Sequence, residues 1–367
     1  MKKKKLLVVR YGAYGDWIYT VPILPYLFSR YDVVLECSPK VGMLAYNDPG
    51  FEKVECFDWA KEIKVTKNMS RLDVVKACGP IFDKRTKYLV DTYKPDEILN
   101  LNGSLETVCI PESFQEEFHL PIEERRKLFL KDSFYDAIFK RATIPVPQMM
   151  KLDCLYYSKK ELDWGKSWRE KNKEKFIIIL AVAGSTFPKV FHGFKDYITA
   201  VLDKYPDVEF YLTGDEQVKK ILPKHPRVKD ACFNAPMKQI FLMTKYADYV
   251  VGPETGVVAA AGMWGTPKTM MCTMSSIDQT TKYQQNDHSI QAPIYCSPCV
   301  RAIYNAQDCH EVKVNEDTGN IYAPCTKLFR VGQLMDILSK VRKNYREGTS
   351  VPHLTDKYLS RKGGQGE

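Results

Sequence analysis

Asp16 is the first residue in the sequence whose type and position suggest a catalytic role. It ends the segment Arg10-Tyr11-Gly12-Ala13-Tyr14-Gly15-Asp16, which follows an apolar run at 6–9 and precedes an expected helix. One interpretation is a helix cap, because an aspartate at a helix start accepts hydrogen bonds from backbone N–H groups. The other is a general base that takes a proton from a substrate hydroxyl. The two roles conflict, since a carboxylate that accepts N–H bonds is a weaker base, and the sequence leaves both open.

A second glycine-bearing turn, Gly252-Pro253-Glu254-Thr255-Gly256, follows the apolar run 249–251 and opens a stretch of small residues. Such turns leave backbone N–H groups and the positive end of a helix dipole facing an anion. We predict that Thr255 and Gly256 present N–H groups to a phosphate. Glu254 would repel that phosphate, so it is predicted to bond a sugar or ribose hydroxyl. The alternative is that the small residues serve only close packing of the helix on a sheet.

Lys189 closes the loop Gly184-Ser185-Thr186-Phe187-Pro188-Lys189, directly after the strongly apolar segment 176–182. A lysine beyond a strand end can neutralise a diphosphate leaving group. Ser185 and Thr186 would add hydroxyl or backbone donors to the same phosphate, with Gly184 at the start of the loop. An ordinary exposed loop lysine is the competing interpretation.

Four of the eleven cysteines cluster late in the chain, at Cys296, Cys299, Cys309 and Cys325. A CxxC unit is a metal knuckle or a redox pair, and two further cysteines favour a structural four-thiolate site for zinc or iron. Unligated thiols and a disulfide are the alternatives, and His310 is a competing ligand. No catalytic metal is expected, because a closed four-cysteine site has no open position. The other seven are interpreted as small buried hydrophobic residues: Cys37, Cys56, Cys78, Cys109, Cys154, Cys232 and Cys272.

The elements that would position these residues alternate between strand and helix. Strands are expected at 6–10, 33–37, 54–57, 97–102, 176–182, 209–213, 248–251 and 268–272. Helices are expected at 17–30, 194–205, 217–222, 237–246 and 257–264, with less regular helical character at 121–151. The pattern predicts an α/β protein with two Rossmann-like, doubly wound domains facing a cleft, and ligands at the carboxyl ends of the strands.

The length of 367 residues also favours two domains over a single core. We predict a first domain over 1–160, a second domain over 161–342 with the cysteine-rich knuckle at 296–325, and a C-terminal tail over 343–367. A linker is expected at about 150–175, where Lys and Glu dominate.

Lysine and arginine outnumber the acidic residues, 54 against 45, which gives a net charge of +9. Such an excess favours anionic partners: nucleotides, phosphorylated glycans, nucleic acid, or a peripheral contact with an anionic membrane surface. The sequence shows neither an eighteen-residue apolar run nor a signal-peptide core, so we expect a cytoplasmic protein.

With these residues in place, the chain resembles glycosyltransferase family nine, the heptosyltransferase-like family of GT-B enzymes. The resemblance spans about residues 5–340. It rests on the strand at 6–10 with Gly15-Asp16 and Pro22, on Lys189 with Phe191 nearby, and on the turn at 254–259 followed by Gly265-Thr266-Pro267. The family's usual aspartate is Glu254 here, and its usual histidine is replaced at Val258 or Ala259.

The resemblance implies an inverting transferase that moves heptose or a related sugar from a nucleotide-diphosphate sugar to a hydroxyl of a glycan, lipopolysaccharide or protein. Asp16 would be the base, while Lys189, Thr255 and Gly256 would stabilise the departing diphosphate without a metal. The resemblance also implies that the domain at 1–160 binds the acceptor and the domain at 161–342 binds the nucleotide-sugar. We predict that the acceptor is bound by Tyr11, Gly12, Tyr14, Gly15, Asn102, Gly103 and Ser104.

Two other functions remain open on the same fold. One is glycosyl transfer to a modified base in DNA, which the basic charge allows. The other is a non-catalytic binder of nucleotide-sugars, which the missing histidine makes plausible. A hydride-transferring Rossmann enzyme is disfavoured because the first turn lacks the GxGxxG spacing.

Overall fold

The computed structural model divides the chain into two compact units, Met1–Ser158 and Lys159–Glu367. The residues that it describes are 3–63, 71–102, 121–184, 188–214, 222–231, 235–300, 309, 311–314, 316, 319 and 321–346. Within this part of the chain, no helix has both the length and the apolar character needed to cross a bilayer.

The first unit is built on a four-stranded parallel sheet in the order β3-β2-β1-β4. Its strands are β1 (Lys4–Arg10), β2 (Tyr31–Cys37), β3 (Phe51–Cys56) and β4 (Glu97–Asn100). Its helices are α1 (Tyr14–Thr20), η1 (Val21–Ile23), α2 (Leu24–Arg30), α3 (Pro39–Ala45), α4 (Trp59–Ile63), α5 (Arg71–Tyr93), α7 (Ile122–Phe129) and α8 (Phe134–Arg141).

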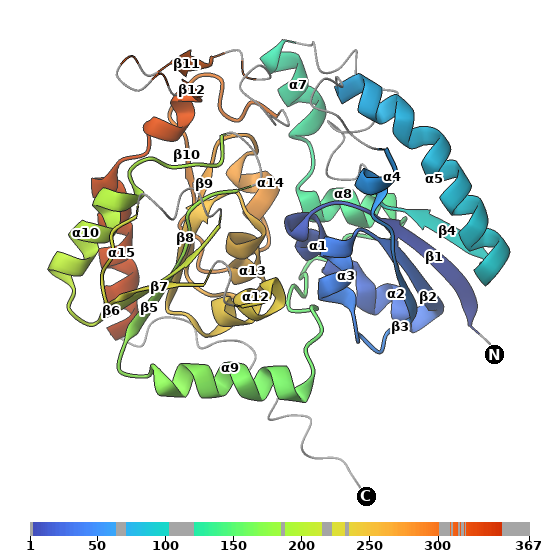
Figure 1. Ribbon diagram of the computed structural model, residues 1–367, viewed down its shortest axis with the longest axis horizontal. Helices are drawn as coiled ribbons and strands as arrows, with labels where there is room; N and C mark the ends of the chain where they lie inside the picture. The colour runs from blue at the N-terminus through green and yellow to red at the C-terminus, as the bar shows by residue number, and fades with distance from the viewer. Residues whose placement is uncertain are drawn as a thin grey trace, which may run out of the picture. The chain divides into compact units, whose positions relative to one another are not determined.

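Alternating side chains of β1 and β2 give this sheet two buried faces. Leu7 and Val9 of β1 and Val34 of β2 pack with Leu89 of α5, so that long helix covers one face (Figure 1). A strand covered on both faces is apolar at nearly every position, which is why β1 was recognisable in the sequence.

The second unit contains a six-stranded parallel sheet in the order β10-β9-β8-β5-β6-β7. Its strands are β5 (Phe176–Ala181), β6 (Val208–Thr213), β7 (Val228–Asp230), β8 (Tyr249–Pro253), β9 (Lys268–Cys272) and β10 (Ile290–Gln291), with a separate hairpin of β11 (Lys313–Val314) and β12 (Ile321–Tyr322). Its helices are α9 (Lys159–Lys171), α10 (Phe194–Lys204), α12 (Met237–Tyr246), α13 (Gly256–Trp264), α14 (Ile277–Thr281), η3 (Pro324–Lys327) and α15 (Val331–Arg346).

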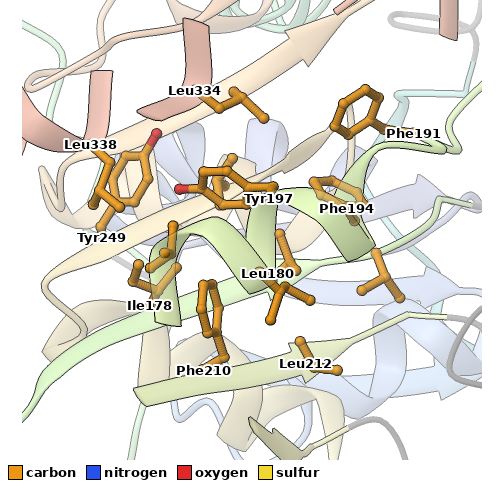
Figure 2. Close-up of a cluster of buried hydrophobic side chains, with 14 of the residues drawn as sticks. Ile178, Leu180, Phe191, Phe194, Tyr197, Phe210, Leu212, Tyr249, Leu334 and Leu338 are labelled. Carbon is orange, nitrogen blue, oxygen red and sulfur yellow. The ribbon is translucent and has the colours of Figure 1, made fainter. Parts of the chain in front are cut away.

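One face of this second sheet carries a large apolar core. Ile178 and Leu180 of β5 lie under Tyr197 of α10, and Leu334 and Leu338 of α15 close the cluster from the C-terminal end of the chain (Figure 2). All five side chains are fully buried or nearly so. Helix α15 is therefore an integral part of the second unit.

Both sheets have a point at which the strand order reverses. Taken in chain order, the second sheet runs 3-2-1-4-5-6, and the first has the corresponding 3-2-1-4 part. The reversal lies between β1 and β4 in the first unit and between β5 and β8 in the second. In open parallel sheets, ligands bind beyond the carboxyl ends of the strands at this point. Asp16 follows β1, Lys189 follows β5 and Glu254 follows β8.

The predicted α/β class with two doubly wound units is confirmed, and all eight predicted strands are present within a few residues. Three predictions need correction. The expected helix at 17–30 begins at Tyr14 and consists of α1, η1 and α2. The expected linker at 150–175 contains helix α9, which packs against α12. The expected tail from 343 starts too early, because α15 continues to Arg346. Helix α5 falls in a segment that showed no clear pattern. Most of the expected helix at 217–222 lies outside the described residues.

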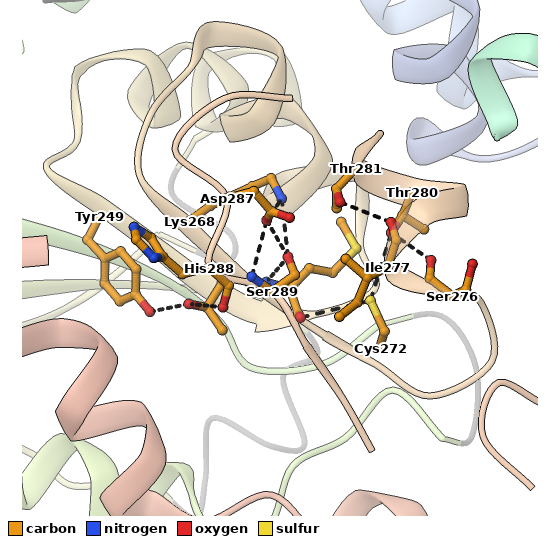
Figure 3. A network of polar contacts seen from close by, with 12 residues as sticks. Tyr249, Lys268, Cys272, Ser276, Ile277, Thr280, Thr281, Asp287, His288 and Ser289 are labelled. Atoms are coloured by element: carbon orange, nitrogen blue, oxygen red, sulfur yellow. Dashed lines mark hydrogen bonds and ion pairs between the residues drawn. The ribbon is translucent and has the colours of Figure 1, made fainter. Parts of the chain in front are cut away.

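A buried polar network lies at the amino ends of β8 and β9, opposite the edge where ligands bind (Figure 3). The ammonium group of Lys268 is fully buried and donates to Asp287 Oδ1 at 2.6 Å and to Ser289 Oγ at 3.3 Å. Burial lowers the pKa of Lys268, an effect that Asp287 opposes. Burial also acts to raise the pKa of Asp287, but Lys268 and Ser289 outweigh it and the pKa is lowered. The hydrogen bonds among Lys268, Asp287 and Ser289 hold the 287–289 segment to β9.

His288 in this segment gives the second unit a pH-dependent stability. Burial lowers its pKa below the ordinary value of 6.5; Asp287 opposes this effect, and Lys268 and Lys340 add to it. The unfolded chain then binds the proton more readily, so below pH 6.5 stability falls as the pH falls. We expect His288→Gln to reduce that slope. The measurement is urea unfolding of both proteins across the acidic range; parallel pH profiles would contradict the prediction.

Candidate functional site

The turn after β1 has a backbone that only glycine adopts readily. Gly12 has a φ of 127°, in the region that side chains disfavour. Its carbonyl oxygen accepts a 2.7 Å hydrogen bond from Ser38 Oγ, and Ser38 also caps helix α3. The turn is thus fixed both by its own conformation and by the residue that follows β2.

Asp16 is the third residue of helix α1, whose N-cap is Ala13. Its Oδ2 accepts a 2.6 Å hydrogen bond from the Ala13 N–H, and its Oδ1 lies 3.7 Å from Nη2 of the fully buried Arg10. In a capping box the N-cap side chain and the third helical side chain each accept the other's backbone N–H. Ala13 has no side-chain acceptor, so here only the bond to Asp16 exists. The expectation of Asp16 as the N-cap is therefore wrong by three positions.

The surroundings of Asp16 leave it accessible and orient it. Its side chain is 24% exposed, while the Ala13 N–H and Arg10 hold the carboxylate in place. Both partners are hydrogen-bonding or charged groups that a carboxylate at this position can bind. Such a group can accept a proton from a hydroxyl in step with bond formation.

The other predicted acceptor residues are in part brought together at this edge. The N–H of Tyr11 donates to Asn102 Oδ1 at 2.7 Å, which joins the ends of β1 and β4. The Tyr11 hydroxyl, however, donates to Glu36 Oε1 at 2.8 Å, and its ring stacks on Phe82 at 5.0 Å. The side chain of Tyr11 thus contacts Glu36 and Phe82 within the first unit, and its predicted contact with an acceptor stays a prediction.

Two further predicted residues of this turn, Tyr14 and Gly15, are partly buried, and burial raises the pKa of Tyr14. Gly103 and Ser104 lie outside the described residues.

A charge network around Glu36 escaped the sequence analysis. Glu36 is fully buried in β2, and Arg85 of α5 donates to its two oxygens from Nε and Nη2, each at 2.9 Å. Arg85 Nη2 also donates to Glu55 at 3.3 Å, and Tyr93 donates to Glu55 at 2.5 Å. Burial raises the pKa of Glu36, against the effect of Arg85 and Tyr11. The signal in the sequence was a glutamate inside the apolar run 33–37.

On the second unit, the loop after β5 folds back on itself. Ala183 and Val190 form an antiparallel bridge, and the Gly184 N–H donates to the Lys189 carbonyl at 2.8 Å. A side chain at Gly184 would lie 2.7 Å from Lys189 Cβ, so the small residue lets Lys189 cross the loop. Lys189 is partly exposed. Ser185 and Thr186 lie outside the described residues.

Glu254 is buried, and the chain's own donors occupy its carboxylate. Oε2 accepts from the N–H and hydroxyl of Thr273, each at 3.0 Å, and from the Met274 N–H at 2.9 Å. Oε1 accepts from the Ser275 N–H at 2.8 Å. A carboxylate offers about four acceptor positions, and three of these donors share Oε2 while one binds Oε1, so little of the buried group is left for a sugar hydroxyl. Glu254 instead fixes the loop after β9.

Thr255 and Gly256 form the start of helix α13 at the predicted anion site. Thr255 is the N-cap, and its Oγ1 accepts from the Val258 N–H at 3.4 Å. Gly256 is the first helical residue, where backbone N–H groups have no partner within the helix. The same helix is buried along its whole length, so the small residues also serve packing on the sheet.

The four late cysteines come together. Cys296, Cys299, Cys309 and Cys325 all line one cavity of about 20 Å³. Burial and the three neighbouring thiols raise the pKa of Cys325. Among the described residues, however, no group of three or more His, Cys, Asp or Glu is arranged to hold a metal ion. The donor set fits zinc or iron, but the arrangement does not show a metal site.

This cavity adjoins both predicted donor loops. Its wall includes Pro188, the neighbour of Lys189, and also Thr273 and Met274, whose N–H groups bind Glu254. The cysteine cluster therefore lies beside the residues expected to bind a nucleotide-sugar.

The sequence matches no protein-family model and no curated protein. Solved structures do resemble it in fold. Heptosyltransferase II of E. coli, titled as an ADP-heptose lipopolysaccharide enzyme, has a TM-score of 0.57 at 13% identity over 93% of this chain and 99% of its own. A family 9 glycosyl transferase of Veillonella parvula has a TM-score of 0.60 at 10% identity over 93% and 98%.

A third similar structure is TibC of enterotoxigenic E. coli, titled as an iron-containing dodecameric glycosyltransferase. It has a TM-score of 0.54 at 12% identity over 94% of this chain and 78% of its own. The chain thus has the fold of these glycosyltransferases over nearly its whole length. The resemblance inferred from the sequence motifs is confirmed at the level of the fold.

The role found for Glu254 can be tested by Glu254→Gln. The amide nitrogen of glutamine would face a donor of the 273–275 loop, so a buried N–H loses its acceptor. We expect the free energy of unfolding to fall by about 1.5–3 kcal/mol, measured by urea denaturation. The exposed Asp278 on α14 provides a matched control, and Asp278→Asn should leave stability nearly unchanged. Equal stability of both variants would contradict the assignment.

Proposed function

We propose that the protein is an inverting glycosyltransferase that transfers heptose or a related sugar from a nucleotide-diphosphate sugar to an acceptor hydroxyl. The observation that carries this proposal is Asp16. It is an oriented, partly exposed carboxylate at the reversal point of the first sheet, on a fold shared with heptosyltransferases. The titles of two such structures name ADP-heptose, and a nucleotide-sugar of that kind is the proposed donor.

In the proposed reaction, Asp16 accepts the proton of the acceptor hydroxyl while its oxygen attacks the anomeric carbon. The bond from that carbon to the diphosphate breaks, and the diphosphate leaves with the electron pair. Attack from the face opposite the leaving group inverts the anomeric centre. The buried Arg10 keeps the carboxylate aimed before the proton arrives.

On the donor side, Lys189 and the start of α13 are proposed to bind the diphosphate. A lysine and helix N-terminal N–H groups stabilise the negative charge that develops on a departing phosphate. Glu254 supports this site indirectly, since it fixes the loop at 273–275 without facing the phosphate. The net charge of +9 adds a general attraction for anionic ligands.

The donor and acceptor roles can be separated by two variants. Asp16→Asn should lower the rate of transfer by about 10²–10⁴-fold and leave donor-induced thermal stabilisation unchanged. Lys189→Ala should reduce that stabilisation. The assays are product formation and thermal shifts with ADP-, UDP-, GDP- and CMP-sugars, since a bound ligand stabilises the folded state. The exposed residues Asp91 and Lys195 supply the controls, as Asp91→Asn and Lys195→Ala.

The outcomes distinguish the remaining functions. Full transfer activity in Asp16→Asn would remove Asp16 from the chemistry. Donor binding by the wild type without turnover on any glycan, lipopolysaccharide or protein acceptor would favour a non-catalytic binder. Transfer to DNA, with binding that weakens steeply with added salt, would identify a modified base as the acceptor.

Cys296, Cys299, Cys309 and Cys325, which line one cavity, are proposed to hold a structural zinc or iron ion. Such an ion would stabilise the fold of the 296–325 segment and take no part in sugar transfer. We expect elemental analysis of the purified protein to find zinc or iron, and Cys299→Ser to lose it together with thermal stability. Cys154→Ser, which changes a cysteine far along the chain from this cluster, is the control. Equal metal content in the two variants would refute the proposal.

A further inference from the structure

Two cysteines of the first unit, Cys37 and Cys56, form an unexpected pair. They are the last residues of β2 and β3 and are direct neighbours in the register of these parallel strands. In-register side chains on neighbouring parallel strands point to the same face of the sheet. Adjacent strands lie about 4.8 Å apart, within the range of about 4.4–6.8 Å that separates the Cα atoms of bridged cysteines.

Helix α3 confirms that the two sulfurs meet at one place. A Cβ added to Gly42 would lie 2.2 Å from Cys56 Sγ and 3.6 Å from Cys37 Sγ. Both thiols are therefore packed against the same bare stretch of the helix backbone. Any residue larger than glycine at this position would displace the Cys56 sulfur.

The environments of the two thiols differ in a way that suits stepwise oxidation. Cys37 is fully buried, whereas Cys56 is exposed. The adjacent Cys37 thiol lowers the pKa of Cys56 to about 7; burial, Glu36 and Glu55 oppose this effect, and Arg85 adds to it. The proximity of Cys56 and burial raise the pKa of Cys37, whose Sγ donates to the Glu55 carbonyl at 3.5 Å. An exposed thiolate beside a second thiol is the arrangement found at oxidation-sensitive cysteines.

We propose that Cys37 and Cys56 form an oxidation site at which a peroxide converts the two thiols into a disulfide. The Cys56 thiolate attacks hydrogen peroxide, which forms a sulfenic acid and releases hydroxide. The Cys37 sulfur then attacks the Cys56 sulfur, the S–O bond breaks and water leaves as the S–S bond forms. The Cys37 proton goes to the oxygen that leaves Cys56, and the hydroxide takes up the proton that Cys56 lost on ionisation. One peroxide and two thiols therefore yield one disulfide and two waters.

This bridge should be easily reversed. Cys56 is exposed, so an incoming thiolate can reach the bridge and reduce it by thiol–disulfide exchange, a property of regulatory disulfides. Its position is also notable, because Ser38 follows Cys37 directly and donates to the Gly12 carbonyl beside the proposed base.

The test uses the full-length protein treated with hydrogen peroxide, then unfolded, alkylated and digested without reduction. We expect a linked peptide pair containing Cys37 and Cys56, which a dithiol reductant removes. It should form at least ~10-fold faster than modification of Cys154, whose pKa burial raises to about 12. Cys37→Ser should instead leave Cys56 as sulfenic or sulfinic acid, and Cys56→Ser should leave Cys37 unmodified.

Gly42→Ala provides a variant that keeps both thiols but displaces one of them. We expect it to slow formation of the linked pair while circular dichroism shows an intact fold. The proposal is overturned if Cys37 remains open to alkylation after peroxide treatment and unfolding. It is equally overturned if Cys56 is linked to any cysteine other than Cys37, or if Gly42→Ala forms the bridge at the wild-type rate.

Discussion

Parallel pairing of β1 with β4 and of β5 with β8 is the constraint on which the candidate sites depend. Parallel pairing places the carboxyl ends of neighbouring strands at the same edge of each sheet. Asp16 and Asn102 reach one such edge, and Lys189 and Glu254 reach the other. Because the loops beyond these ends take no part in the strand ladders, their N–H groups and side chains are available for a ligand or for each other.

The carboxylates Glu36, Glu254 and Asp16 differ in their hydrogen bonds to the chain and in their exposure to solvent. The Glu254 carboxylate accepts four hydrogen bonds from the chain. The Glu36 carboxylate accepts two from Arg85 and one from the Tyr11 hydroxyl. Both are buried, where an unsatisfied charge would be costly. Asp16 accepts a backbone N–H and lies 3.7 Å from Arg10, and about a quarter of its side chain is exposed. This exposure is the reason for proposing Asp16 as the reacting group, whereas Glu36 and Glu254 hold helices and loops in place.

Much of the fold was predictable because buried parallel strands are apolar at nearly every position. The elements that were missed are amphipathic or polar: α5, α9 and α15 present one face to a core and carry many charged residues on the other. Their burial depends on distant partners, as Leu338 on β5 and β8 shows. The roles of the candidate site residues stay predictions. The sequence did not indicate the bond of Tyr11 to Glu36 or that of Thr273 to Glu254, because each joins segments that are not neighbours in the chain.

The sequence by itself determined the alternation of strands and helices, the glycine-bearing turns and the spacing of the late cysteines, because these depend on neighbouring residues. Only the tertiary structure decided which polar groups are hydrogen-bonded within the chain and which thiols lie next to each other. Cys37 and Cys56 looked like separate small hydrophobic residues, and strand register made them a pair. Which strands become neighbours depends on segments far apart in the sequence, and the residue types within one strand do not identify its partner strand.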